Sequence, residues 1–357
     1  MYFLCKYMKL DKETCRSVLT VGCQHLPPRG GVAQVLYIYD KYIFESFNKL
    51  TDTREGSRVV KLGQFGLACI MLFFRLLFDT KIKIVHVHTS SYNSFRRSKV
   101  FVRIAKMLRR RVILHVHGGN FKEYYDSDCS GIKPVLDSCD CIIALSDSWK
   151  TFFMSVTDGP EVVVVPNPVE PPRLMDVEAD GKVHMLYLGL LTEAKGIYDL
   201  LDVVKEGLDD YNGRLILHVG GNGEVGQLQK VIEEAGLQDV VKYEGWLDGE
   251  RKSRLMNRCC VYVLPSYHEG LPVSILEAMS YGEYIVSTKV GGIPEVVGKD
   301  VGVLINPGDR KALKDVLDSI VCSGESLPDR SLIRRHAQQY MPDRIALKLI
   351  EIYSEYL

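Results

Sequence analysis

The stretch CVYVLPSYHEGLPVSILEAMSYGEYIVST, Cys260–Thr288, sets a helical segment between two short apolar runs. The runs CVYVLP and EYIVST are rich in β-branched residues, which is typical of buried strands in a parallel sheet. Between them, Pro272 suits the first position of a helix, where its missing N–H leaves no donor unpaired. This order of strand, helix and strand predicts an α/β fold with parallel strands.

The start of the predicted helix combines an anion site with two carboxylates. Unpaired backbone N–H groups and the helix dipole both favour a phosphate at a helix N-terminus. Glu277 lies about a turn into the helix and Glu269 precedes it, so each can reach a sugar hydroxyl. The segment therefore predicts a sugar-nucleotide site, with an ordinary turn into a surface helix as the alternative. The backbone of this site is that of Gly270, Leu271, Pro272, Val273 and Ser274.

Apolar runs alternate with helical patterns along the whole chain. The first half contains the strand candidates SVLTVGC, IKIVHVH, RVILHVH, CIIALS and EVVVVP, and the second half contains VHMLYLG, RLILHVG, VVKYEG, CVYVLP and EYIVST. A Pro-rich segment without periodicity, Val165–Lys182, separates the halves and has the composition of a linker. We therefore expect two doubly wound, Rossmann-like domains with a ligand cleft between them.

The expected domains are residues 1–170 and 171–341, followed by a helix over residues 342–357. That last helix is expected to have one apolar face, formed by Ile345, Leu349, Ile352 and Tyr356. Within the first domain, residues 121–133 are expected to form a polar loop. The helices expected in the first domain are Val32–Asn48, Gly66–Phe78, Phe95–Arg109 and Ser148–Val156.

Composition places the chain among soluble globular proteins of a reducing compartment. The 357 residues carry 45 Lys and Arg against 45 Asp and Glu, which argues against non-specific binding of nucleic acid. The ten cysteines form no Cys-x-x-Cys pair, and no signal peptide is visible. The longest apolar stretch, Leu67–Phe78, is interrupted by Arg75, so we expect a core helix there, with a helix on a membrane surface as the alternative.

Three further groups follow predicted strands. Paired glycines after Arg29 would let the backbone approach a ligand, and a flexible turn is the alternative. His117 precedes two glycines at a strand exit, where a hydrogen-bonded structural histidine is the alternative. Lys195 opens a helix against its dipole, which favours a role at a phosphate over that of a surface lysine.

A rival pattern indicates a dinucleotide cofactor. Gly221, Gly223 and Gly226 match the G-x-G-x-x-G spacing, with Glu244 about twenty residues further on, as in an NAD-dependent oxidoreductase. Against this hypothesis, the pattern follows the second strand of its domain instead of the first. It also leaves Glu269 and Glu277 without a role.

Metal chemistry is expected to play no part. His86, His88, His115 and His117 could suggest a hydrolytic metal site, but no carboxylate lies at ligand spacing near them. The acidic pair in Asp126-Ser-Asp128 follows no predicted strand, so a solvated loop is expected instead of a metal motif.

Together these residues resemble the retaining glycosyltransferases of family 4, also called "group 1", which have the GT-B fold. The resemblance is strongest from Met185 to Val303. Its specific elements are the two glutamates of EGLPVSILEAM, Lys195-Gly196, GGIPEVV at Gly291–Val297, Gly30-Gly31 and His117-Gly118-Gly119.

The resemblance implies a role for each residue. Glu277 would hold the ribose hydroxyls, and Lys195 with the backbone of Gly270–Ser274 would hold the diphosphate. Glu269 and His117 would contact the donor sugar as the catalytic pair. Gly31 would let a loop of the first, acceptor-side domain close over the phosphates, and Gly221 and Trp246 would border the base. The last helix, residues 342–357, would pack back on the first domain.

The resemblance also implies a reaction and its partners. A UDP- or GDP-sugar would donate a hexosyl group, with retention and without metal or other cofactor, to a glycan or an acceptor on a lipid carrier. Synthesis of lipopolysaccharide or capsule at the inner face of the cytoplasmic membrane is the expected setting, with a peripheral membrane contact. One departure is Leu190, where the family often carries Arg, and we expect Arg29 to supply the missing cation. A sugar-nucleotide epimerase or a non-catalytic binder is the remaining alternative.

Overall fold

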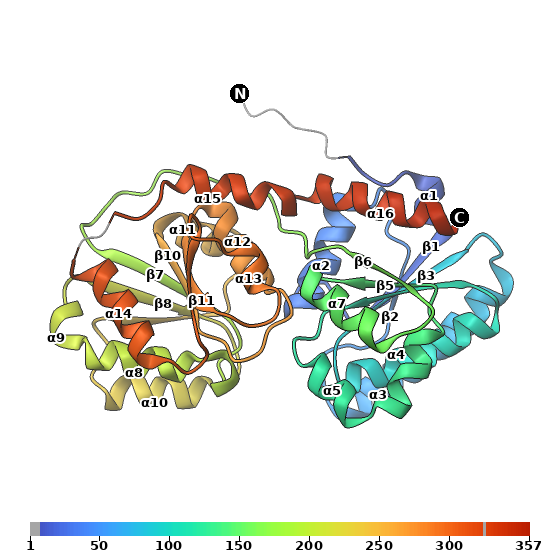
Figure 1. Cartoon of the computed structure of the whole chain (residues 1–357), viewed down its shortest axis with the longest axis horizontal. Helices are drawn as coiled ribbons and strands as arrows, with labels where there is room; N and C mark the ends of the chain where they lie inside the picture. The colour runs from blue at the N-terminus through green and yellow to red at the C-terminus, as the bar shows by residue number, and fades with distance from the viewer. Residues whose placement is uncertain (1–7, 324–325) are drawn as a thin grey trace. The chain divides into compact units, whose positions relative to one another are not determined.

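The computed structural model describes residues 8–323 and 326–357, which divide into two compact units (Figure 1). The first unit comprises Met1–Glu170 together with Gln339–Leu357, and the second comprises Pro171–Gln338. The boundary at Glu170 lies in the Pro-rich segment Val165–Lys182, which forms neither helix nor strand.

Each unit is built on a parallel sheet of six strands, so the predicted parallel α/β fold is confirmed. The order is β2-β1-β3-β4-β5-β6 in the first unit and β12-β11-β10-β7-β8-β9 in the second. The strands of the first unit are β1 (Val18–Gly22), β2 (Lys49–Thr51), β3 (Ile84–Thr89), β4 (Arg111–Val116), β5 (Cys141–Ala144) and β6 (Glu161–Val164). Those of the second are β7 (Val183–Leu188), β8 (Leu215–Gly220), β9 (Val241–Gly245), β10 (Val261–Leu264), β11 (Tyr284–Thr288) and β12 (Gly302–Ile305).

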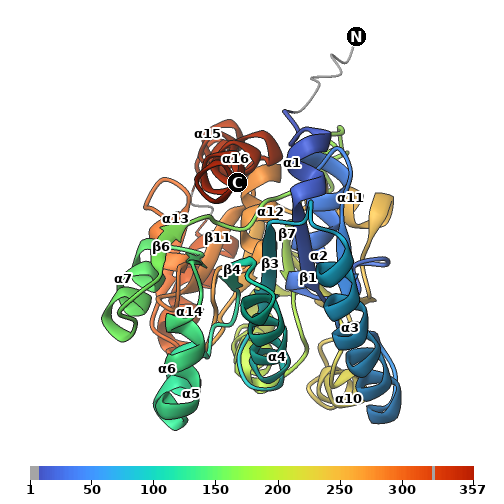
Figure 2. The same cartoon turned by 90° about the vertical axis from the view of Figure 1, so that its right-hand side faces the viewer.

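Helices cover both faces of each sheet, which explains why the strands are almost continuously apolar. In the first unit, α3 and α4 lie below the sheet and α1 and α16 lie above it (Figure 1; Figure 2). The helices of this unit are α1 (Lys12–Ser17), α2 (Gly31–Ile38), which continues as a π-helix over Tyr39–Ile43, α3 (Arg58–Phe78), α4 (Asn93–Met107), α5 (Phe121–Ser127), α6 (Cys129–Asp137), α7 (Asp147–Val156) and α16 (Pro342–Tyr356).

In the second unit, α8, α10 and α14 lie below the sheet, whereas α11, α12 and α15 lie above it (Figure 1). The helices are α8 (Ile197–Glu206), α9 (Leu208–Tyr211), α10 (Val225–Glu234), α11 (Gly249–Arg258), α12 (Val273–Tyr281), α13 (Ile293–Val296), α14 (Arg310–Val321) and α15 (Arg330–Ala337). Single 3₁₀ turns at Glu193–Lys195 and Gln338–Tyr340 precede α8 and α16.

Several local predictions were wrong. The helix expected over Val32–Asn48 ends at Ile43, and Lys49–Thr51 then pairs with β1 as an edge strand. Residues 121–133 are not a loop, since they form α5 and most of α6. Aromatic burial explains that error, because Phe121 and Tyr124 are buried in the core of the first unit although polar residues surround them in the sequence.

The apolar stretch Leu67–Phe78 is not a core helix. It is the second half of α3, whose 21 residues begin at Arg58, where Ser57 caps the first turn through the N–H of Val60. Only Ala68, Leu72 and Leu76 of this helix are buried. The sequence could not reveal this, because α3 carries apolar residues on its outward face as well as on its inward face.

Candidate functional site

The strand order of the second unit marks one place where a ligand would bind. The chain runs from β7 outward through β8 and β9, and then returns to the other side of β7 with β10. In open parallel sheets, ligands bind beyond the carboxyl ends of the two strands where the order reverses. Here these strands are β7 and β10. Lys195 follows β7 and Glu269 follows β10, so the topology brings both predicted residues to this point.

Lys195 and Glu269 form an ion pair. The ammonium Nζ of Lys195 lies 2.6 Å from Oε1 of Glu269 and donates a second hydrogen bond of 3.3 Å to the carbonyl of His268. The glutamate side chain is only 10 % exposed and that of the lysine 26 % exposed. The Lys195 turn is fixed by Gly196, whose φ of 70° and close approach to the Pro265 carbonyl exclude a side chain.

The helix N-terminus beside this pair is open. Pro272 is the N-cap of α12 and not its first residue as predicted, since the helix begins at Val273. No side chain among the described residues caps the helix. The first N–H groups of an uncapped helix can bind an anion, and its dipole favours one. Both parts of the predicted phosphate site, a lysine and an open helix start, therefore stand at the switch point of the sheet.

Glu277 lies inside α12 and is almost buried. Its Oε2 lies 2.6 Å from Nζ of Lys252, which belongs to α11, and the two side chains are 9 % and 22 % exposed. Sequence reasoning missed Lys252. No sequence signal pointed to it, because the pair joins two helices and Lys252 stands in a surface helix rich in charge.

A second loop supports the one that carries Glu269. The N–H of Gly292 donates a hydrogen bond of 2.6 Å to the carbonyl of Gly270. Gly291 has a φ of 53°, and a Cβ built on it would lie 2.0 Å from the carbonyl oxygen of Glu269. The GGIPEVV motif thus has a structural purpose, since only glycine lets this loop pack against the backbone of the predicted site.

Packing explains Gly221 and Gly223 of the dinucleotide pattern, whereas no atom lies within 4 Å of a Cβ built on Gly226. A Cβ on Gly221 would lie 1.9 Å from the carbonyl oxygen of Gly189, so the loops after β7 and β8 can touch only if this residue is glycine. Trp246, which follows β9 and is 40 % exposed, stands close by, since the Gly221 N–H bonds the carbonyl of Gly245. These two residues could form the border of a base pocket.

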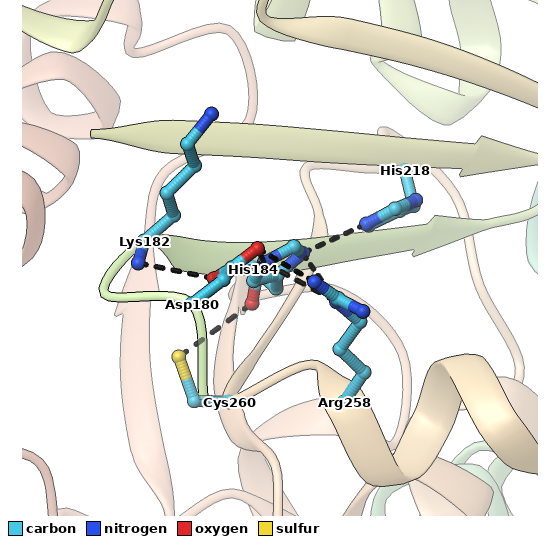
Figure 3. Close-up of polar contacts among 6 residues, drawn as sticks. All are labelled: Asp180, Lys182, His184, His218, Arg258 and Cys260. Carbon is cyan, nitrogen blue, oxygen red and sulfur yellow. Dashed lines mark hydrogen bonds and ion pairs between the residues drawn. The ribbon is translucent and has the colours of Figure 1, made fainter. Parts of the chain in front are cut away.

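Glu244, the acidic residue of the dinucleotide pattern, belongs to a chain of hydrogen bonds. His184 Nε2 lies 3.0 Å from the carboxylate of Asp180, and His184 Nδ1 lies 3.0 Å from His218 Nε2 (Figure 3). His218 Nδ1 then lies 2.8 Å from Glu244, which Arg251 also binds. Burial lowers the pKa of His218, with the hydrogen bond to Glu244 opposing. Glu244 is thus committed to this network, which counts against a role at a ribose.

In the first unit, His117 follows β4, and both of its ring nitrogens are engaged. Nδ1 lies 3.1 Å from Oδ1 of Asn167, and Nε2 lies 2.9 Å from Nδ1 of His88. Since the amide oxygen can only accept, Nδ1 of His117 carries the proton and Nε2 accepts from His88. Burial lowers the pKa of His117 to about 4, with the bond to Asn167 opposing, so the ring is neutral at pH 7.

Three other histidines form a buried stack under His117. Ligand atoms of His86, His88 and His115 all lie within 4.8 Å of one another. A tetrahedral zinc would hold its ligand atoms about 3.4 Å apart. The rings of His86 and His115 are instead parallel, at 5.5 Å between centroids. The arrangement is that of stacked imidazoles, whose pKa values burial lowers.

The remaining predicted residues of the first unit have other contacts. Arg29 forms an exposed ion pair of 2.8 Å with Glu55. Gly31 begins α2 and has no atom within 4 Å of a Cβ built on it, so packing does not explain the glycine. Asp128 caps α6 through the N–H of Gly131 and pairs with Lys99, which corrects its expected place in a solvated loop.

Comparison with known proteins gives a family for most of the second unit. Residues 176–338 match the model of the family described as "Glycosyl transferases group 1". An uncharacterized glycosyltransferase of Methanocaldococcus jannaschii is 26 % identical over 61 % of this chain and 60 % of its own length. The putative colanic acid biosynthesis glycosyltransferase WcaL of Salmonella typhimurium is 30 % identical over 49 % of this chain and 46 % of its own. The chain thus spans less than two thirds of these curated relatives.

A solved structure extends the likeness to nearly the whole chain. Anabaena HepE, in complex with UDP-glucose, has a TM-score of 0.72 and 18 % identity, and the match covers 95 % of this chain and 99 % of HepE. At this identity the likeness establishes the fold, which is GT-B.

Proposed function

We propose that the chain transfers a sugar from a nucleotide-diphosphate sugar, because residues 176–338 match the model of the glycosyl transferases group 1 family. The observation that carries the proposal is the Lys195–Glu269 ion pair beside the open start of α12, at the switch point of the second sheet. A diphosphate placed there meets an ammonium group and helix N–H groups, and a carboxylate stands next to it.

The geometry suggests how these groups act during transfer. As the glycosidic bond breaks, negative charge grows on the departing diphosphate, and preorganised donors aimed at it lower the barrier. Lys195 and the first N–H groups of α12 are such donors. Positive charge grows at the same time on the sugar ring, where the Glu269 carboxylate can offset it. Lys195 then bridges the diphosphate and Glu269.

Glu277 is the proposed anchor of the ribose. Its carboxylate has a single charged partner, Lys252, among the contacts of the described residues, so an oxygen is left to accept from a ribose hydroxyl. Stacking of the base on the exposed face of Trp246 would complete the nucleotide site. Leu190 adds no charge, so Lys195 and α12 hold the diphosphate, with Arg29 as the proposed further cation once it leaves Glu55.

Retention and independence of metal are parts of the same proposal. The diphosphate charge is balanced by protein groups, which removes the need for a divalent cation. Front-face attack would then use the phosphate itself to take the acceptor proton. His117 is the proposed contact of the transferred sugar from the first unit. Its Nε2 must give up the hydrogen bond from His88 to accept one from a sugar hydroxyl.

The donor and acceptor classes are proposed from the relatives. HepE was crystallised with UDP-glucose, which supports a UDP-sugar, with a GDP-sugar as the alternative. WcaL is named for colanic acid synthesis, which supports a glycan or lipid-linked acceptor in the making of a cell-surface polysaccharide. Such a reaction would take place on the cytoplasmic side of the membrane.

Thermal unfolding in the presence of candidate donors tests the site. A ligand at a hundred times its Kd stabilises the fold by about 2.7 kcal/mol, so the correct nucleotide sugar should raise Tm clearly. We expect a rise with a UDP- or GDP-sugar, unchanged by EDTA, and none with NAD. Lys195→Ala and Glu277→Ala should each abolish most of it.

Lys230→Ala is the matched control, because Lys230 lies in the same unit but its side chain is 64 % exposed on α10. This variant should keep the full donor-induced rise. A rise with NAD alone would favour the oxidoreductase, and an unchanged rise in both site variants would refute the placement of the donor.

A further inference from the structure

We propose that the outward face of α3 docks on the surface of an anionic lipid bilayer. Nine large apolar side chains of this helix are exposed, from 41 % for Met71 to 79 % for Val59. Monomeric soluble proteins rarely leave so much contiguous apolar surface in water unless something covers it. The exposed members are Val59, Val60, Leu62, Leu67, Ile70, Met71, Phe74, Leu77 and Phe78.

The two sides of α3 have different tasks. Ala68, Leu72 and Leu76 recur every four residues and are fully buried against the core of the first unit. Between Lys61 and Arg75 the helix carries no charged residue, so its outward side lacks the polar face of an ordinary surface helix. Folding of this unit therefore buries one side of α3 and leaves the apolar other side for a partner.

Charge around this helix identifies the partner. Residues 58–111, which include α3 and α4, contain thirteen Lys and Arg and a single Asp, in a chain whose formal charge is zero. Four of these cations form ion pairs with Asp52, Asp128 or Asp140. α3 and α4 lie next to one another on the same face of the sheet (Figure 1; Figure 2). An apolar helix flanked by cations is what the surface of a membrane with anionic lipids attracts.

A hollow at the end of α3 adds a place for a lipid headgroup. Its volume is about 570 Å³, and Phe74 and Phe78 stand in its wall beside three cationic side chains. A headgroup phosphate can pair with the cations while its acyl chains lie along the phenyl rings. The lining residues are Arg16, Phe74, Arg75, Phe78, Asp79, Thr80 and Lys81.

The helix would lie on the bilayer instead of crossing it. By length and composition α3 could span a membrane, with a mean hydropathy of 1.7. Crossing, however, would pull Ala68, Leu72 and Leu76 out of the core that they complete. A helix held in this way can only immerse its outward side, to the depth of the headgroups and the first acyl carbons.

A second copy of this chain is the less suitable occupant. A symmetric dimer through α3 would place the basic surface of one copy against the same surface of the other, because such interfaces are isologous. Like charges would then face one another around the apolar strip. A bilayer with anionic lipids presents the complementary sign.

Sedimentation with lipid vesicles tests the proposal, and it needs neither donor nor transfer. The whole chain should sediment with vesicles of phosphatidylcholine and phosphatidylglycerol, less with phosphatidylcholine alone, and less at high salt. The double variant Ile70→Glu, Phe74→Glu removes two apolar side chains that are 57 % and 50 % exposed. We expect its partition to fall by on the order of tenfold or more.

Met154→Glu is the matched control, since Met154 is 60 % exposed on α7 of the same unit, and it should sediment like the wild type. The donor-induced rise in Tm should persist in the double variant, which shows that it is folded and separates this proposal from that of the donor site. Absence of the wild type from the pellet, or equal sedimentation of the double variant, would overturn the proposal. So would a wild-type dimer that the double variant turns into a monomer while vesicle binding stays the same.

Discussion

Glu269 owes its position to residues outside its own loop. Lys195 holds its carboxylate, Gly291 allows a neighbouring loop to press against its carbonyl, and Gly292 binds the next peptide group. Glycine is required where two backbone segments pack this closely, because a Cβ would collide with a carbonyl oxygen of the other segment.

Gly291→Ala should therefore damage the donor site without touching a ligand. The added Cβ would lie 2.0 Å from the Glu269 carbonyl, at a φ of 53°, and the loop must shift. We expect a loss of stability of about 1–3 kcal/mol in urea unfolding and a weaker donor-induced rise in Tm. Gly298→Ala is the control, because no atom lies within 4 Å of its Cβ. Wild-type donor binding in Gly291→Ala would show that the contact is dispensable.

At the level of single residues, the sequence indicated the groups that follow strands but not their partners. Lys195, Glu269 and Glu277 were found because each stands at a fixed distance from a strand end or a helix start. Lys252 and His88 were not assigned as partners, since their contacts join segments that only the folded sheet brings together. The roles of Lys195, Glu269 and Glu277 as ligand contacts stay predictions.

Strands were easier to predict than helices in this chain. The five apolar runs named in each half all contain a strand, because burial on both faces makes parallel strands continuously apolar. The strands that were missed, β2 and β12, are short and lie at sheet edges. Among the helices, α5 and α6 were predicted as a polar loop although they bury aromatic and aliphatic side chains. α3 was predicted as a core helix although most of its apolar side chains are exposed.

The stacked histidines of β3 and β4 make the first unit sensitive to acid. Burial lowers the pKa of His86 to about 3 and that of His117 to about 4, and it lowers those of His88 and His115 well below the usual value. In the unfolded chain these four histidines bind protons below about pH 6.5, whereas in the folded chain they stay neutral. Stability should thus fall as the pH drops from about 6.5 towards 4, by up to about 1.4 kcal/mol per pH unit for each histidine.

Urea unfolding at several pH values between 7.5 and 5 checks this. His115→Gln removes one of the buried groups, so its stability should depend less steeply on pH than that of the wild type. Leu347→Gln, at a position of α16 that is 42 % exposed, removes no titratable group and should keep the wild-type slope. Equal slopes in all three proteins would mean that the stack takes no part in acid unfolding.

At the scale of the molecule, two sheets of the same design carry different chemistry. The second unit holds the ion pair and the open helix start, whereas the first holds a neutral histidine stack and an apolar helix exposed to solvent. The C-terminal segment is part of the first unit, where Tyr353 of α16 binds His86 through a hydrogen bond of 2.6 Å. Two doubly wound domains could be predicted from strand alternation and a Pro-rich linker, and the GT-B fold from the resemblance to a glycosyltransferase family. The exposure of apolar side chains on α3 could not be predicted, since the sequence does not show which side of this helix packs on the core.

Transfer of labelled sugar into lipid is the most direct assay of the proposed reaction. The wild type would be incubated with a labelled donor that raises its Tm and with total membrane lipid. We expect label in the organic phase, with one nucleoside diphosphate released per sugar, and at least a tenfold lower rate for Lys195→Ala at saturating lipid. If the donor binds but neither Lys195→Ala nor Glu277→Ala slows the transfer, or if lipid and glycan acceptors alike stay unlabelled, the chain does not use this site to transfer a sugar.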